Sequence, residues 1–294
     1  MHYVVTGSLG NTGKPITEGL LKAGHTVTVV TSKPETVTKI EALGAKAAVG
    51  DVQDADFITS TFANADALYL MIPPKWGVTD WRGYQNVVSD NYIAAIKAND
   101  IRFAVILSSI GAHKGQGTGP VDGLYDLEQK LKTVDGLNVK ALRPSYFMQN
   151  LYSMIGIVKG MSIMGANFGT DKLVLVHTDD IAEVAIEELN RLDFTRFQVR
   201  YIAGDERTGA EIAQILGVAI GKPEIPWVVF TDEQQYQGAM QAGLTDEMAK
   251  KYTEMGLSLS DGSMQADYMD NRPVLSKTKL EDFARNEFAP AFQA

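Results

Sequence analysis

The chain has 294 residues, of which 45% are hydrophobic, and carries a formal net charge of −9 with no cysteine. This length and hydrophobic content allow a large core, which we expect to be divided between two lobes. The acidic balance argues against direct binding to nucleic acid, and the absence of cysteine together with four scattered histidines excludes disulfides, thiol nucleophiles and zinc–thiolate sites, so that no metal site is predicted.

The first 33 residues combine an apolar run, a glycine-rich turn and a helix-like pattern. The run His2–Thr6 leads into the turn 7–13, and a helical repeat then ends at Gly24 before a second apolar run, Val27–Thr31. This order predicts a phosphate cradle whose amides face the pyrophosphate of a dinucleotide. A purely structural turn is the alternative, because the spacing is GxxGxxG rather than GxGxxG. The residues expected at the cofactor are Gly7, Leu9, Gly10, Asn11, Thr12 and Gly13.

The end of the second apolar run indicates which dinucleotide is bound. An acidic residue there would hold the ribose 2′-hydroxyl of NAD, whereas NADP needs room and positive charge for a 2′-phosphate. Ser32 and Lys33 occupy this position, and Glu35 comes only after a proline. We therefore expect NADP(H), with NAD(H) as the alternative, and we expect Ser32 and Lys33 to donate to the phosphate. The other interpretation of Lys33 is a solvated turn residue.

Strands and helices then alternate in the way that builds an α/β fold with a Rossmann-type, doubly wound parallel sheet. Further strands are expected at 45–49, 67–72, 102–107 and 139–144, with helices at 81–99 and 124–133. Ligands of such sheets lie beyond the carboxyl ends of the strands, so the residues that follow the strands mark the cleft. Those expected to contact the cofactor are Asp51, Ile72, Pro73, Pro74, Ser108 and Ser109.

After residue 150 the alternation weakens. Leu173–Val176 and Arg200–Ala203 still read as strands of the main sheet, whereas the chain from Asp205 onward is rich in helices and turns. We therefore expect the carboxyl-terminal part to form a separate, smaller lobe that covers the substrate. The expected division is a Rossmann domain of residues 1–150 with 173–204 added to it, and a mostly helical lobe of residues 151–172 and 205–294.

Several blocks spread over nearly the whole chain carry a family resemblance. They are the turn 7–13, Gly50-Asp51, Ser108–Ala112, Leu142–Asn150, Asp179–Ala182 and the segment Gly204–Pro223. In these blocks the sequence resembles the NmrA-like group of atypical short-chain dehydrogenase/reductases, which includes NADPH-dependent quinone reductases and non-catalytic redox sensors. The resemblance implies that Asp51 lies near the adenine edge, and the alternative is that this aspartate only forms the turn after a strand. The chain departs from this group at Ser32, where relatives often carry arginine and where Lys33 would substitute.

A residue pair that drives related chemistry is missing from the sequence. Ordinary short-chain dehydrogenases use a Tyr-x-x-x-Lys helix, in which the lysine lowers the tyrosine pKa for proton exchange with a carbonyl or hydroxyl. No tyrosine here has lysine four residues later: Tyr125 comes closest, but Gln129 holds that position and Lys130 lies about 100° further round the helix. Hydride transfer to a quinone requires positioning rather than a tuned phenol, because water can protonate the stabilised hydroquinone anion.

The remaining candidates have less support. Tyr125, His113 and Lys114 are possible proton donors, and each also has an interpretation as a packing or solvated loop residue. An aromatic cluster after a strand is more often core than pocket, and this alternative stays open for the residues that follow residue 144. The acceptor pocket is expected to contain Trp76, Gly111, Tyr146, Phe147, Met148 and Asn150.

The sequence leaves three functions open. We favour an NADPH-dependent reductase of quinones or similar flat acceptors, because the apolar strand ends supply a pocket for a small-molecule acceptor. The alternatives are a sensor that binds NADP(H) and regulates a protein partner without turnover, and a reductase of a specialised carbonyl or imine. No apolar run approaches the ~20 residues that span a bilayer, so we expect no membrane association and a cytoplasmic location.

Overall fold

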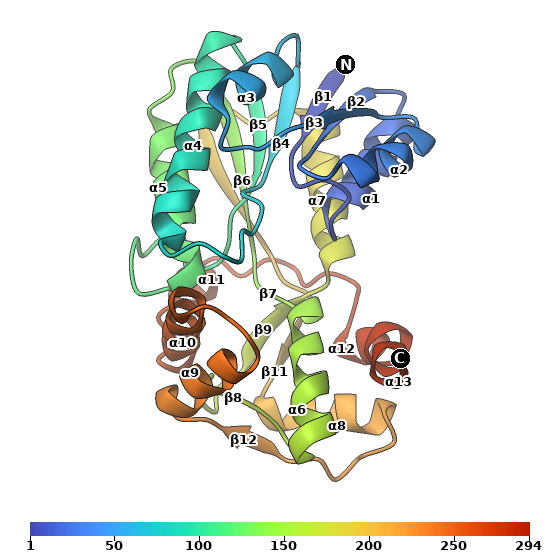
Figure 1. The fold of residues 1–294 in the computed structure, drawn as a ribbon, viewed down its shortest axis with the longest axis vertical. Helices are drawn as coiled ribbons and strands as arrows, with labels where there is room; N and C mark the ends of the chain where they lie inside the picture. The colour runs from blue at the N-terminus through green and yellow to red at the C-terminus, as the bar shows by residue number, and fades with distance from the viewer.

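The computed structural model, which describes residues 1–294, places a seven-stranded parallel sheet at one end of the molecule (Figure 1). Its strands are β1 (His2–Val5), β2 (Thr26–Thr31), β3 (Lys46–Val49), β4 (Ala67–Leu70), β5 (Phe103–Leu107), β6 (Asn138–Pro144) and β10 (Phe197–Ile202). They lie in the order β10-β6-β5-β4-β1-β2-β3. The order therefore reverses between β1 and β4, which is where doubly wound sheets bind their ligands.

Alternate strand residues of the sheet face two different helix layers. In β1, Val4 packs into one layer while Tyr3 and Val5 pack into the other. Helices cover both faces, and the central strands β4 and β5 are apolar along their whole length, as is typical of a parallel sheet, whereas the edge strands β3 and β10 also carry exposed polar residues. One layer holds α3 (Ala55–Thr61), α4 (Trp81–Ala98) and α5 (Asp122–Lys132), and the other holds α1 (Gly13–Lys22), α2 (Val37–Ala42) and α7 (Thr178–Arg191).

A second set of elements lies at the other end and has a core of its own (Figure 1). Its strands are β7 (Tyr146–Phe147), β8 (Met164–Ala166), β9 (Leu173–Val176), β11 (Asp205–Arg207) and β12 (Trp227–Val229), which pair as β11-β9-β7 and β12-β8. The helices are α6 (Ser153–Met161), α8 (Gly209–Ala219), α9 (Asp232–Gln241), α10 (Asp246–Ser260), α11 (Ala266–Asp270), α12 (Leu280–Phe283) and α13 (Ala289–Gln293). Shorter turns are the 3₁₀-helices η1 (Pro34–Thr36), η2 (Gly119–Val121) and η3 (Met148–Tyr152) and the π-helix η4 (Ala284–Phe288).

The predicted fold class is confirmed, with one strand misplaced. The segment Arg200–Ala203 belongs to the main sheet as expected, since β10 pairs with β6. The expectation that Leu173–Val176 joins that sheet is wrong: β9 pairs with β7 and β11. All four residues of β9 are apolar and buried, so the sequence pattern could not distinguish one sheet from another.

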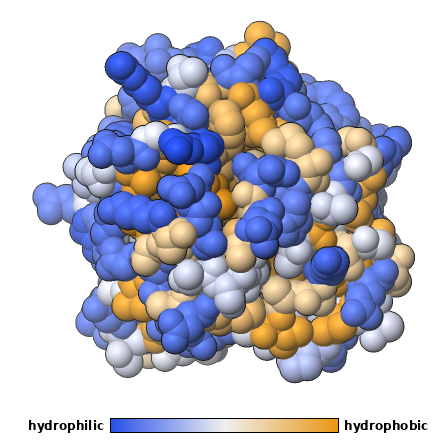
Figure 2. Space-filling view, turned by 90° about the horizontal axis from the view of Figure 1, so that it is seen from above, coloured by the Kyte–Doolittle hydropathy of each residue, from blue (hydrophilic) through white to orange (hydrophobic).

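The surface agrees with the sequence composition. On the face seen from above, hydrophilic side chains alternate with hydrophobic patches (Figure 2). None of the helices combines the length and the hydropathy needed to cross a bilayer.

Candidate functional site

The glycine turn follows β1, at the point where the strand order reverses. Gly7 has a φ of +94°, and a Cβ there would lie 2.0 Å from the Met71 sulfur. A Cβ at Gly13 would lie 2.2 Å from the Ser8 carbonyl oxygen. These two glycines are therefore required by the backbone itself. Gly10 is different, because it is exposed and its added Cβ would meet only the Gly7 carbonyl oxygen, at 3.2 Å.

The turn presents unused backbone donors at the N-terminus of α1. The N–H groups of Leu9, Asn11, Thr12 and Gly13 donate to no acceptor in the protein. No side chain caps α1, and its first turn contains no acidic residue. Free amides at a helix N-terminus, without a competing carboxylate, favour an anion. The turn therefore fits the pyrophosphate of a dinucleotide.

The end of β2 is tied to this turn. The Thr31 hydroxyl oxygen accepts hydrogen bonds from the Ser8 hydroxyl at 3.0 Å and from the Lys33 N–H at 3.2 Å. The side chains of Ser32 and Lys33 are exposed and make no hydrogen bond or ion pair. Ser32 and Lys33 thus follow Thr31, which contacts the glycine turn, and their side-chain polar groups are free to bind a phosphate.

Asp51 lies in the loop after β3 and is exposed. One of its carboxylate oxygens accepts the Gln53 N–H at 2.9 Å, and the other lies 3.5 Å from Nζ of Lys75. Lys75 comes from the loop after β4 and also contacts the Gln53 side chain. The sequence did not single out this lysine, which links two of the loops predicted to border the cofactor.

The loop after β4 has a buried start and an exposed tip. Ile72 is buried, and the Pro73 carbonyl accepts a 2.7 Å hydrogen bond from the hydroxyl of Tyr84, whose pKa burial raises to about 12. Pro74 is exposed, and the Trp76 side chain is 56% exposed with its ring centroid 6.3 Å from that of Trp81. The tip therefore presents an aromatic face beyond the carboxyl end of β4.

The side chain of Ser108, which directly follows β5, belongs to a buried network of hydrogen bonds and ion pairs. Its hydroxyl donates to Glu128 of α5 at 2.5 Å, and Glu128 in turn accepts two hydrogen bonds from Arg143. Arg143 also donates to Asp267 of α11 and to the Tyr201 hydroxyl, at 2.7 and 2.8 Å. This geometry corrects the expectation for the Ser108 side chain, which holds the network together rather than facing a ligand.

The loop after β5 contains the two basic candidates. His113 has a buried Nδ1 without a partner, and burial lowers its pKa. The Lys114 ammonium donates to the Ser263 hydroxyl. Ser109 is half-buried, and its carbonyl accepts the N–H of residue 112 at 3.2 Å. Gly111 is buried, and an added Cβ would lie 2.8 Å from Met264, so it does not line an open pocket as expected.

The side chains of Tyr125 and Lys130 have different surroundings. The Tyr125 ring lies against Gly115, and its hydroxyl makes no hydrogen bond. Lys130 instead contacts α4, with its Nζ 2.7 Å from both Asn86 Oδ1 and Asp90 Oδ1. The Lys130 ammonium group therefore binds α4 and not the Tyr125 hydroxyl.

The block after β6 contains half-buried, fully buried and exposed residues. Tyr146 packs edge to face with Phe168 at 5.4 Å between ring centroids, and Phe147 packs half-buried against the core of the main sheet. Met148 is fully buried in the lobe core, which corrects its assignment to a pocket. Asn150 is exposed, and its carbonyl accepts the hydroxyl of Ser153. Core and pocket residues are both apolar, so composition could not separate them.

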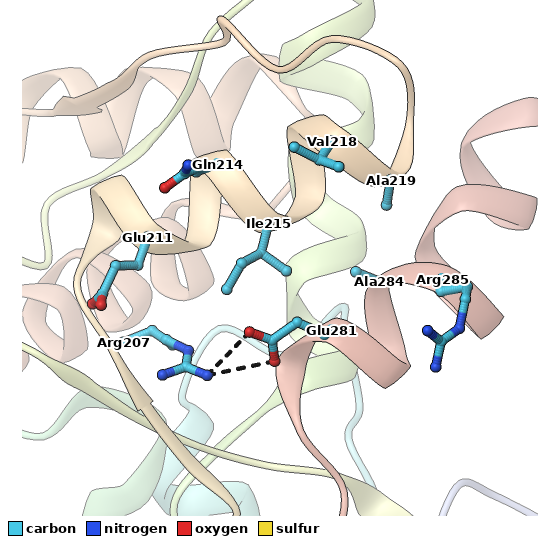
Figure 3. A pocket seen from close by; sticks show the side chains of 9 residues that line it. All are labelled: Arg207, Glu211, Gln214, Ile215, Val218, Ala219, Glu281, Ala284 and Arg285. Atoms are coloured by element: carbon cyan, nitrogen blue, oxygen red, sulfur yellow. Dashed lines mark hydrogen bonds and ion pairs between the residues drawn. The ribbon is translucent and has the colours of Figure 1, made fainter.

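A surface cavity of about 610 Å³ lies between α8 and the C-terminal helices (Figure 3). Its charged groups are largely paired, since Arg207 binds Glu281 and Arg285 binds Asp282. None of the residues predicted for the site belongs to it. The cavity is lined by Arg207, Glu211, Gln214, Ile215, Val218, Ala219, Glu281, Ala284 and Arg285.

Similar proteins are found over the whole chain. Residues 7–191 match the sequence profile of the NAD(P)H-binding family. The chain is 23% identical to the NAD(P)H azoreductase of Xenophilus azovorans over 99% of this chain and 98% of that relative.

Two solved structures are similar in fold. The NADPH-dependent quinone oxidoreductase of Escherichia coli, in complex with NADPH, has a TM-score of 0.83 and 19% identity, covering 97% of this chain and 99% of the other. The triphenylmethane reductase of Citrobacter sp., in complex with NADP(H), has a TM-score of 0.78 and 17% identity, with the same coverage of 97% and 99%. At these identities the likeness establishes the fold.

Proposed function

The chain belongs to the NAD(P)H-binding family, and from that premise we propose that it is a reductase that transfers a hydride from NADPH to a quinone or a similarly flat acceptor. The observation that carries the proposal is the glycine turn, whose free amides between Leu9 and Gly13 stand where the strand order reverses. When bound, NADPH supplies the hydride. The matched family and the likeness to an NAD(P)H azoreductase and an NADPH-dependent quinone oxidoreductase support an NAD(P)H-dependent oxidoreductase, in line with the resemblance to the NmrA-like group.

The preference for NADPH over NADH rests on the end of β2. No carboxylate stands there to bind a ribose 2′-hydroxyl, while Lys33 places an unpaired ammonium group on an exposed turn. A phosphate would gain a charge-assisted contact at this position, whereas a hydroxyl would not.

The acceptor is inferred from the similar proteins and from the exposed aromatic group. Their names refer to azo, quinone and triphenylmethane compounds, which are conjugated molecules. Trp76 offers a stacking face at the end of β4, and Tyr146 offers a second ring after β6. Both strand ends lie on the side of the sheet where ligands bind.

We propose that this chain works without a Tyr-x-x-x-Lys pair. Tyr125 has no lysine at hydrogen-bonding distance, because Lys130 is held by Asn86 and Asp90 on α4. No lysine is therefore in place to lower the pKa of this phenol. What the protein contributes is alignment of the two reactants in a site from which water is excluded.

The two units take different parts in the proposed mechanism. Residues 1–150 without β7 and η3, but with α7 and β10, would bind the cofactor, and residues 151–172 and 205–294, together with β7, η3 and β9, would cover the acceptor. Arg143 connects them, since it binds Glu128 in the first unit and Asp267 in the second. This contact fixes the carboxyl ends of β5 and β6 relative to the covering lobe.

The test is the oxidation of NADPH, followed by its absorbance with a panel of quinones, azo dyes and aldehydes. We expect turnover with quinones or azo dyes and little with aldehydes, because an aldehyde yields an alkoxide that needs a proton donor. Turnover confined to aldehydes would overturn the choice of acceptor. Tight NADPH binding without turnover on any acceptor would favour the sensor.

A further inference from the structure

The hydroxyl of Tyr69 reaches the start of α1 from the main sheet. Tyr69 lies on β4 and is paired with Val5, the last residue of β1 before the glycine turn. Its side chain is fully buried in the apolar layer that includes residues of α1. There its hydroxyl donates a 3.2 Å hydrogen bond to Oγ1 of Thr12, whose side chain is also buried. One buried contact thus connects the strand beside the turn to the first turn of α1.

This contact determines where the Thr12 hydroxyl points. Burial raises the pKa of the Tyr69 phenol, which therefore stays protonated at neutral pH and donates. A buried phenol needs a hydrogen-bond partner, and the Thr12 oxygen provides it. The Thr12 side chain is consequently turned toward Tyr69, and it makes no capping hydrogen bond to the backbone of α1.

A threonine at the start of a helix commonly has a different role. In an extended conformation its hydroxyl accepts the N–H of the second or third helical residue and so sets where the helix begins. Thr12 instead has helical dihedral angles, with φ −101° and ψ −37°. The N–H of Lys14 donates to the Gly10 carbonyl at 3.1 Å, so helical hydrogen bonding already begins at Gly10.

The two conformations of Thr12 differ in how many amides face a ligand. In the observed one, the N–H groups of residues 11–13 form the first turn and donate to no acceptor in the protein. A Thr12 that capped α1 would accept the Lys14 N–H and break its bond to Gly10. The helix would then begin at Gly13, and fewer amides would be aligned at the N-terminus, where an anion binds.

On the basis of the proposed function, we propose that Tyr69 is a positioning residue of the cofactor site. Its hydroxyl holds Thr12 in the first turn of α1, so that the amides of residues 11–13 stay aligned for the pyrophosphate. Tyr69 is fully buried and acts only through Thr12. Because NADP⁺ and NAD⁺ share the pyrophosphate, this effect does not depend on the 2′-phosphate, in contrast to the one proposed for Lys33.

The test is calorimetric titration of the full chain with NADP⁺ and with NAD⁺, for wild type and Tyr69→Phe. We expect the variant to bind both dinucleotides about tenfold more weakly, because the released hydroxyl competes with the pyrophosphate for backbone amides. The same substitution is then made in a Thr12→Val background, which has no hydroxyl to release. There, adding Tyr69→Phe should change either affinity by less than about twofold, because the phenol has no hydroxyl to hold.

Tyr3→Phe is the matched control, because Tyr3 is fully buried in the same layer and its hydroxyl donates to the Leu189 carbonyl of α7 at 2.8 Å. It should lower the melting temperature about as much as Tyr69→Phe and leave the binding of both dinucleotides unchanged. A Tyr69→Phe variant that binds like wild type, or that loses as much affinity in the Thr12→Val background, would overturn the inference.

The proposed function fails on different results. Wild type that binds neither dinucleotide would overturn the cofactor site and the inference together. Wild type that binds NADP⁺ through this contact but never oxidises NADPH would overturn the proposed reductase and leave the role of Tyr69 standing.

Discussion

Arg143 of β6 and Glu128 of α5 form a two-pronged ion pair, with Nε to Oε1 at 3.0 Å and Nη2 to Oε2 at 2.6 Å. Glu128 is fully buried, and Arg143 is nearly so. The remaining arm of the guanidinium donates to Asp267 of α11 at 2.7 Å. One arginine thereby joins the sheet to the lobe at the edge where the cofactor and acceptor are proposed to meet.

Glu128→Gln should destabilise the protein by about 3 kcal/mol, because it leaves a buried guanidinium without one of its two charged partners. Urea denaturation measures this loss. The control is Glu18→Gln, which removes an exposed pair 3.8 Å from Lys14 and should change the free energy of unfolding by about 0.5 kcal/mol or less. Equal effects from the two variants would show that the buried network contributes no more than a surface pair.

Lys33→Ala should weaken NADP⁺ binding about tenfold and leave NAD⁺ binding nearly unchanged, because the proposed partner of the ammonium group is the 2′-phosphate, which NAD⁺ lacks. Calorimetric titration with both dinucleotides provides the comparison. Lys22→Ala removes the same charge from the other end of α1 and should affect neither. If wild type bound both cofactors with equal affinity, the proposed NADP preference would be wrong, although the assignment of the fold would stand.

Gly10→Val should abolish cofactor binding in a protein that still folds. Gly10 is exposed and does not have a positive φ, so a side chain there meets the Gly7 carbonyl oxygen and otherwise occupies the space proposed for the pyrophosphate. Circular dichroism reports the fold, and titration reports the binding. Gly13→Ala should fail differently, by unfolding, because its Cβ would clash with the Ser8 carbonyl. Normal NADP⁺ binding by folded Gly10→Val would make the turn purely structural.

Local features of the sequence predicted much of the fold. The glycine turn was readable because its strand, turn and helix are consecutive, and strands β2, β4 and β5 were readable because each is a largely apolar run ended by a turn. Leu173–Val176 was misplaced because a short, fully apolar strand fits any buried sheet.

The candidate site depends more than the fold does on contacts between residues that are far apart in the sequence. Arg143 and Asp267 are 124 positions apart, and nothing in their local sequences indicates that they pair. Of these two residues only Arg143 has a local signal, because it is a charged residue among the buried positions at the end of β6, and such a residue needs a partner.

Tyr125→Phe should leave most quinone reductase activity in place. Its hydroxyl has no lysine partner, since Lys130 binds Asn86 and Asp90, and hydride transfer to a quinone does not depend on a tuned phenol. A general acid would behave differently, because its loss typically costs about 10²- to 10⁴-fold in rate. Steady-state kinetics with one active quinone distinguish these cases, provided that NADPH affinity is measured in parallel. A loss in that range with unchanged NADPH binding would make Tyr125 the proton donor of a conventional dehydrogenase with a displaced lysine.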